Sequence, residues 1–112
     1  MRCIFCQIAN KEIPVKFIFE DERLMAFNDL HPAASVHVLI VPKQHIPTIN
    51  NITERDKSLL GEMILLAQKI ASDGGIAPSG YKLIFNCGEN GGQTIQHIHL
   101  HLIGGEKIKC IV

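Results

Sequence analysis

Three histidines, His97, His99 and His101, lie two residues apart near the end of the chain, with Ile98 and Leu100 between them. Alternate side chains of a β-strand point to the same face, so this spacing places three imidazoles on one face and the aliphatic side chains on the other. A buried imidazole needs a polar partner, so packing alone hardly explains three of them. The pattern indicates either a three-histidine metal site or a phosphate pocket in which one imidazole is the nucleophile.

A glycine-rich segment, 86–94, comes directly before these histidines. Its glycines, Gly92 among them, allow backbone N–H groups to approach an anion, and Gln93 and Thr94 add neutral hydrogen-bond donors. No Lys-Ser or Lys-Thr pair follows, so the segment is not a nucleotide-binding P-loop. Next to three histidines, the segment favours the phosphate pocket.

Cys3 and Cys6 form a Cys-x-x-Cys motif at the start of the chain. This spacing suits Zn²⁺, which needs two further ligands that neutral histidines elsewhere in the chain can supply. A redox dithiol is the alternative, but the motif does not follow a strand in a βαβ pattern. The motif therefore favours a metal site over redox chemistry.

The pattern of apolar residues predicts an α+β fold, an antiparallel sheet of about five strands with one main helix on a face. The expected strands are 15–19, 24–27, 36–41, 81–85 and 95–103, and 3–8 is expected to be a short apolar turn. The helix is expected to begin near Thr53, with Asp56 completing the cap, and to end at Gly74 and Gly75. Its predicted apolar stripe is Leu59, Leu60, Met63, Ile64, Ala67 and Ile70.

Length and charge narrow the class of protein. A chain of 112 residues is expected to be a single domain, 1–112. Eleven basic residues balance 11 acidic ones, which argues against nucleic acid as a partner. The first residues lack the apolar stretch and small-residue cleavage site of a signal peptide, and no apolar run reaches about 20 residues, so we expect a cytoplasmic protein that does not enter a membrane. A small chain with a mean hydropathy of +0.17 is also expected to bury surface as a homodimer.

The run from His97 to Ile103 resembles the signature of the histidine triad family. In this signature three histidines alternate with apolar residues, and two further apolar residues follow the third histidine. The resemblance extends from Cys3 to about Gly105 through the segments 3–6, 11–14, 19–21, 26–29, 37–46 and 91–94. It is nearest to the Hint-type branch, homodimeric proteins that bind nucleotides and hydrolyse purine nucleoside 5'-phosphoramidates to a nucleoside monophosphate and an amine.

The resemblance implies a role for each motif. His99 would attack the α-phosphorus to give a covalent nucleotidyl-histidine, and the carbonyl of His97 would hold its other ring nitrogen. His37 and His101 would contact phosphate oxygens or transfer protons. Gln93 and Thr94 would bind phosphate oxygens and the leaving group, and Gly92 would lie in the phosphate loop.

The resemblance also implies which residues bind the nucleoside and the metal. Asp29 would accept hydrogen bonds from the ribose hydroxyls, and Asn86 would assist near the ribose and phosphate. The apolar slot for the base would be formed by Phe5, Ile8, Phe27 and Leu30. Many bacterial relatives with this cysteine motif bind a structural zinc ion, for which the ligands here would be Cys3, Cys6, His45 and His97.

Two other functions remain open at this stage. Thr94 stands where many Hint-type proteins have serine and where the dinucleoside polyphosphate hydrolases of the superfamily often have threonine. Gly104, Gly105 and the segment 11–14 favour the Hint type, and Leu100 argues against the nucleotidyltransferases, which have proline between two of the histidines. The alternatives are a dinucleoside polyphosphate hydrolase and a nucleotide-binding protein whose hydrolysis is incidental.

Overall fold

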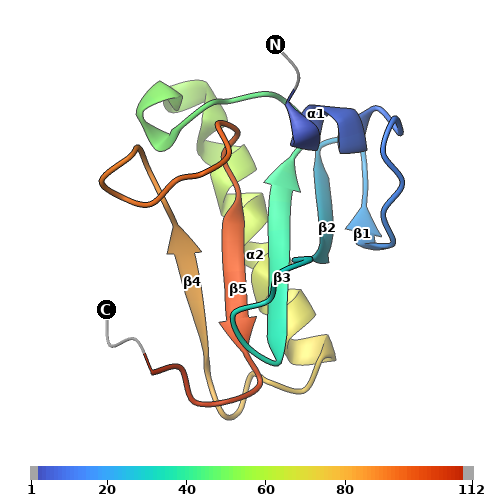
Figure 1. Cartoon of the computed structure of the whole chain (residues 1–112), viewed down its shortest axis with the longest axis vertical. Coiled ribbons are helices and arrows are strands. Elements are labelled where there is room, and N and C mark those ends of the chain that lie inside the picture. The colour runs from blue at the N-terminus through green and yellow to red at the C-terminus, as the bar shows by residue number, and fades with distance from the viewer. Residues whose placement is uncertain (1–2, 110–112) are drawn as a thin grey trace.

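The computed structural model describes residues 3–109, which form a five-stranded antiparallel sheet and one long helix (Figure 1). The order across the sheet is β1-β2-β3-β5-β4. The elements are α1 (Ile4–Ala9), β1 (Phe17–Glu20), β2 (Leu24–Asn28), β3 (Val36–Pro42), two short 3₁₀ helices (Ile49–Asn51 and Glu54–Asp56), α2 (Lys57–Asp73), β4 (Tyr81–Phe85) and β5 (Leu100–Gly104). The predicted α+β architecture is therefore confirmed.

The sequence prediction was wrong at two places that matter for chemistry. The segment 95–103 is not one strand, because Ile98 N–H bonds to Ile46 O and His97 N–H bonds to Ile95 O, and pairing with β3 begins only at Leu100. The alternation of faces nevertheless continues upstream of β5, since Ile98 belongs to the core beneath α2. The expected apolar turn at 3–8 is instead the short helix α1.

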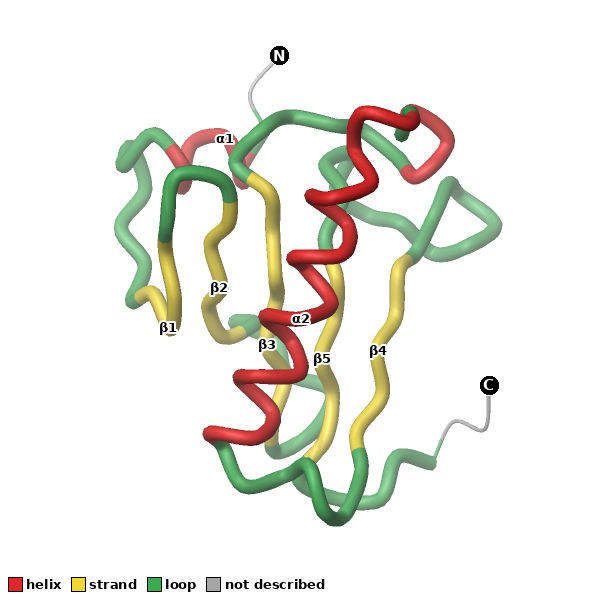
Figure 2. Tube along the Cα trace, turned by 180° about the vertical axis from the view of Figure 1, so that it is seen from behind, coloured by secondary structure: helices red, strands yellow, loops and turns green. Residues whose placement is uncertain are grey.

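Helix α2 begins and ends close to the predicted positions. Thr53 and Asp56 form a capping box on the 3₁₀ turn that leads into the helix, and Gly74 caps its end, followed by Gly75 with a φ of +76°. This left-handed conformation suits glycine because it has no Cβ. The helix lies across one face of the sheet (Figure 2).

The apolar stripe of α2 was predicted only in part. The buried positions are Leu59, Met63, Leu66, Ala67 and Ala71, which follow a 3.6-residue period. Ile64 does not belong to this stripe, because it lies about 100° round the helix from Met63 and its side chain is 47% exposed. Leu66 and Ala71 are buried in the core, although the predicted stripe did not include them.

Two apolar clusters lie on opposite faces of the sheet. The larger one fills the space between α2 and the sheet and includes Ile40, Met63 and Leu102. The smaller one contains Phe5 and Ile8 of α1 together with Met25, Phe27, Leu39 and Val41 of the sheet. Helix α1 is thus fixed to the face opposite α2, near the end of β3 and the segment that leads into β5 (Figure 1).

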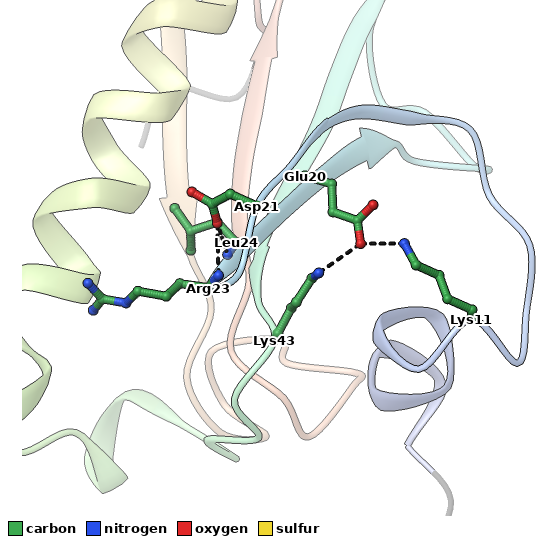
Figure 3. Close-up of polar contacts among 6 residues, drawn as sticks. All are labelled: Lys11, Glu20, Asp21, Arg23, Leu24 and Lys43. Carbon is green, nitrogen blue, oxygen red and sulfur yellow. Dashed lines mark hydrogen bonds and ion pairs between the residues drawn. The ribbon is translucent and has the colours of Figure 1, made fainter.

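Polar contacts join the loop after α1 to the sheet and close the β1–β2 turn (Figure 3). The Glu20 carboxylate binds both the Lys11 and the Lys43 ammonium groups, and these contacts lower the pKa of Glu20. Asp21 accepts hydrogen bonds from the N–H groups of Arg23 and Leu24 and so closes the β1–β2 turn.

No helix among residues 3–109 is long and apolar enough to cross a membrane.

Adjacent residues of α2 provide a test of this packing. Met63→Ala is expected to lower the free energy of unfolding by about 2–5 kcal/mol, because it empties a fully buried position. Ile64→Ala is expected to cost less than about 1 kcal/mol, because much of that side chain stays in water. Urea unfolding followed by circular dichroism measures both; equal losses would show that the assigned buried face of α2 is wrong.

Candidate active site and metal centre

His99 is held so that one ring nitrogen is available. It is 6% exposed, and its Nδ1–H donates to the carbonyl oxygen of His97 at 2.7 Å. The proton is therefore on Nδ1, and the lone pair of Nε2 is free to act as a nucleophile. Burial lowers the pKa of His99, so its imidazole is neutral near pH 7. The Phe5 ring packs edge-on against it at a centroid distance of 5.1 Å.

His37 and His101 form a hydrogen-bonded chain with a defined direction. Ala33 N–H donates to His37 Nδ1 at 2.9 Å, so the proton of a neutral His37 is on Nε2. That Nε2 lies 2.9 Å from His101 Nδ1, which must accept and leaves the proton of His101 on its own Nε2. Burial, with the nearby His99 and His37, lowers the pKa of His101 to about 4. His101 thus offers a neutral N–H donor beside His99, whose ring centroid is 5.0 Å away.

Four side chains converge as a candidate metal centre, and the ligand atoms of Cys3, Cys6, His45 and His97 all lie within 4.8 Å of one another. His97 Nδ1 is 3.3 Å from Cys3 Sγ and 3.2 Å from His45 Nδ1. A tetrahedral metal with thiolate and imidazole ligands has ligand-to-ligand distances of about 3.3–3.8 Å. The residues present therefore fit a four-coordinate metal ion.

Protonation supports the same interpretation. His97 Nε2 lies 2.7 Å from the Pro42 carbonyl oxygen, which can only accept, so the proton is on Nε2 and the Nδ1 lone pair points into the cluster. Burial lowers the pKa of His97, which keeps it neutral, as a ligand must be. Burial and the neighbouring Cys3 raise the pKa of Cys6, a penalty on the thiolate that a bound cation would remove.

Asp29, His37 and His101 are a second group with ligand atoms close together. Asp29 Oδ2 lies 3.4 Å from His37 Nε2. The hydrogen bond from Ala33 places a proton on that nitrogen, so it has no lone pair to give to a metal. This group is better described as a hydrogen-bonded chain than as a metal site.

The glycine-rich segment is a tight loop closed by its own side chains. Asn86 Nδ2 donates to Gly91 O at 2.7 Å, and Gly92 has a φ of +80°. A Cβ on Gly91 would lie 2.4 Å from Cys87 O, so no larger residue fits. Thr94 is exposed at the end of the loop. The amide of Gln93, expected to bind phosphate, donates instead to Pro47 O and Ile95 O.

The residues expected to hold the nucleoside occupy different environments. Asp29 is half-buried, and its Oδ1 accepts the N–H of His31 at 2.9 Å, while Oδ2 faces His37. Phe5, Ile8 and Phe27 belong to the apolar cluster between α1 and the sheet. Leu30 is separate from them and 86% exposed.

Ala33 and Pro42 fix the protonation states of the site, although no sequence pattern pointed to them. Both act through backbone atoms, an N–H group for Ala33 and a carbonyl for Pro42. Backbone groups are the same in every residue type, so no sequence signal marks them.

Similar proteins show the family to which this chain belongs. The family model described as "Scavenger mRNA decapping enzyme C-term binding" matches residues 2–110. An uncharacterized HIT-like protein of Buchnera aphidicola is 44% identical over 108 residues, which are 96% of each chain. The chain belongs to the histidine triad (HIT) family. A HIT relative named purine nucleoside phosphoramidase, from Escherichia coli, is 44% identical over 105 residues, 94% of this chain and 88% of the relative.

Solved HIT structures share the whole fold. A HIT family hydrolase from Legionella pneumophila superposes with a TM-score of 0.93 at 46% identity, over 95% of both chains. A histidine triad protein from Clostridium difficile superposes with a TM-score of 0.94 at 40% identity, over 100% of this chain and 97% of that one. The five-stranded sheet with one main helix is therefore the HIT fold.

The lowered pKa of His101 predicts how stability depends on pH. As pH falls from about 6.5 to about 4, the unfolded chain takes up a proton on His101 before the folded chain does, so the free energy of unfolding decreases. His101→Asn is expected to make this decrease smaller, whereas His97 and His99, whose pKa values are also lowered, keep it from vanishing. Urea unfolding across this pH range, with a chelator present to remove metal effects, measures the difference; superimposable profiles would contradict the assignment.

Proposed function

We propose that this protein hydrolyses purine nucleoside 5'-phosphoramidates to a nucleoside monophosphate and an amine, through a covalent intermediate on His99. The observation that carries the proposal is the hydrogen bond from His99 Nδ1–H to His97 O, which leaves Nε2 of a neutral imidazole free. The name of the E. coli relative, purine nucleoside phosphoramidase, supports the choice of substrate.

In the first step His99 Nε2 forms a bond to the α-phosphorus, and the bond between phosphorus and the amine nitrogen breaks. The His99 ring keeps its Nδ1 proton and becomes cationic, and the His97 carbonyl oxygen, 2.7 Å from Nδ1, stabilises this charge. The departing amine nitrogen must gain a proton. We assign this donation to the exposed Thr94 hydroxyl, which lies on the leaving-group side in the resemblance and recovers its proton from the water that attacks in the second step.

In the second step water attacks the phosphorus, the bond to His99 Nε2 breaks, and the nucleoside monophosphate is released. His101 remains neutral at pH 7 because its pKa is about 4, so its Nε2–H serves as a hydrogen-bond donor to a phosphate oxygen rather than as an acid. His37 positions His101 through the bond between their ring nitrogens. Gly92, with its φ of +80°, would keep the loop close to the phosphate, while its own N–H is bonded to Glu89 O within the loop.

For the nucleoside, we propose that Asp29 accepts the ribose hydroxyls and that Asn86 supports the loop beside them. The purine would lie against the apolar residues of the α1 side, Phe5, Ile8, Phe27 and Leu30. The first three are packed in the smaller apolar cluster, whose surface would face the base, and the exposed Leu30 would cover the base from outside.

We propose zinc as the metal of the cluster formed by Cys3, Cys6, His45 and His97. Two thiolates and two imidazoles are a typical donor set for structural Zn²⁺, and four protein ligands leave no open position for substrate. The ion would fasten α1, which contains Cys6 and has Cys3 as its N-cap residue, to the segment before β5. Its role here is structural, and the chemical steps belong to the histidines.

We propose a single-domain protein that pairs with itself in the cytoplasm. The resemblance to the homodimeric Hint-type branch supports pairing, as do the position of β4 at one edge of the sheet and the 37% exposure of Leu83 on it. The balance of acidic and basic residues supports a nucleotide rather than a nucleic acid as partner.

His99→Ala is expected to lower kcat on an adenosine 5'-phosphoramidate by roughly 10³-fold or more, because the nucleophile is lost. Affinity for AMP should remain close to that of the wild type. The matched control is His31→Ala, which removes an exposed histidine outside the triad. Mass spectrometry of rapidly quenched wild-type protein should locate an adenylate on His99. If His99→Ala keeps most of its turnover, His99 is not the nucleophile and the proposed mechanism is wrong.

The same assay separates the alternatives. A dinucleoside polyphosphate offered in parallel should be cleaved more slowly than the phosphoramidate. A preference for the polyphosphate would overturn the proposed substrate class and keep the covalent mechanism.

Cys3→Ser is expected to reduce bound zinc from about one ion per chain to well below that, and to lower the midpoint of thermal unfolding, because a ligand is lost. Cys87→Ser is the matched control, since Cys87 is a half-buried free thiol that belongs to neither group of candidate ligands. Metal analysis and thermal unfolding measure both effects. Unchanged zinc content in Cys3→Ser would remove Cys3 from the ligand set.

A further inference from the structure

Gln93 is a nearly buried amide whose hydrogen-bonding groups are all engaged. It is 7% exposed; its Nε2 donates to Pro47 O at 2.7 Å and to Ile95 O at 2.9 Å. Its Oε1 accepts the N–H of Gly88 at 3.0 Å. Carbonyl oxygens only accept and backbone N–H groups only donate, so exchanging Oε1 and Nε2 would break all three bonds. The orientation of this amide is therefore fixed.

This arrangement leaves no hydrogen of the amide for a ligand. Gln93 could donate to a phosphate oxygen only by giving up its bond to Pro47 or to Ile95. The engaged amide instead joins two segments that are distant in sequence, the glycine-rich loop and the segment that follows β3. The role of the Gln93 amide therefore depends on which functional residue the segment after β3 carries.

The second segment carries His45 of the metal cluster and is fastened on both sides of it. The two carbonyls that follow His45 accept hydrogen bonds, Ile46 O from the Ile98 N–H at 2.8 Å and Pro47 O from Gln93. The carbonyl of Pro42, which precedes it, accepts from His97 Nε2. Every one of these donors comes from 93–98, the segment that supplies His97 to the same cluster.

Packing does not hold His45 on its outer side. Its side chain is exposed, and it borders a surface cavity of about 430 Å³ whose lining includes Pro47, Asn51 and Arg55. On the inner side the next residue, Ile46, is buried in the larger apolar cluster, so the backbone bonds set how His45 and Pro47 lie around this anchor rather than holding the segment alone. The Gln93 amide supplies one of these bonds, two residues from the ligand.

We propose that Gln93 is a positioning residue of the metal centre. Its bond to Pro47 keeps His45 within ligand distance of the two cysteines and His97, and its bonds to Gly88 and Ile95 tie the glycine-rich loop to the same point. Gln93 thus sets metal affinity without touching the metal. The inference rests on the metal centre proposed above, and it replaces direct phosphate binding as the role of this side chain.

The test is the zinc affinity of Gln93→Glu and Gln93→Met, measured with Zn²⁺ alone in competition with a chromogenic chelator. The glutamate places a carboxylate oxygen against two carbonyls, and the methionine keeps the length but has no donor. Both are expected to bind zinc about 10–100-fold more weakly than wild type, the usual effect of losing a partner that orients a ligand. Gln96→Glu, the same change at an exposed position of the same segment, should leave the affinity unchanged.

Affinity for AMP, measured on the same proteins, distinguishes the two roles. Wild-type zinc affinity in both Gln93 variants, with weakened AMP binding, would overturn the inference and assign Gln93 to phosphate. If Gln93→Glu does not fold by circular dichroism, Gln93→Met decides the question. A wild-type protein that binds no zinc would remove the metal centre itself, together with this inference; zinc bound equally by wild type and both variants would remove the inference alone.

Discussion

The hydrogen bond from His99 Nδ1 to the carbonyl oxygen of His97 is the contact on which the rest of the site depends. It decides which nitrogen of His99 is free, and it can do so only if the backbone at His97 is held still. The His97 side chain provides this restraint, since one ring nitrogen bonds to Pro42 and the other faces the two cysteines. One residue thus contributes its side chain to the candidate metal centre and its backbone to the nucleophile.

The sheet separates the part of the protein that stabilises from the part that reacts. On one face, α2 and the strands enclose the larger apolar cluster, to which Ile98, Leu100 and Leu102 belong. On the other face, Phe5 of α1 touches both His97 and His99. Alternation along 97–102 lets one segment serve both faces. A rigid core can therefore support the histidines without itself contributing a reacting group.

The sequence was sufficient for features that repeat or that depend on residue type. The bounds of β4 and the end of α2 were predicted correctly, and the cysteine and histidine motifs led to residues that do converge. The start of β5 was missed because a hydrogen bond to Ile46, distant in sequence, determines it. Ile64 and Leu66 were confused because both are apolar and only the packed helix shows which one faces the sheet. The engagement of Gln93 could not be predicted, since an amide has the same donors whether they meet a ligand or a backbone carbonyl.

The neutral state of the imidazoles has a consequence for how the product leaves. Lowered pKa values keep His97, His99 and His101 uncharged near pH 7, and Asp29 adds a negative charge beside them. The groups that we assign to the phosphate are therefore dipoles, N–H and O–H bonds rather than full positive charges. A site of this kind stabilises the cationic His99 formed during reaction better than it holds a dianionic nucleotide afterwards. The affinity of the site for the nucleotide should therefore depend little on ionic strength, and release of the monophosphate need not limit turnover.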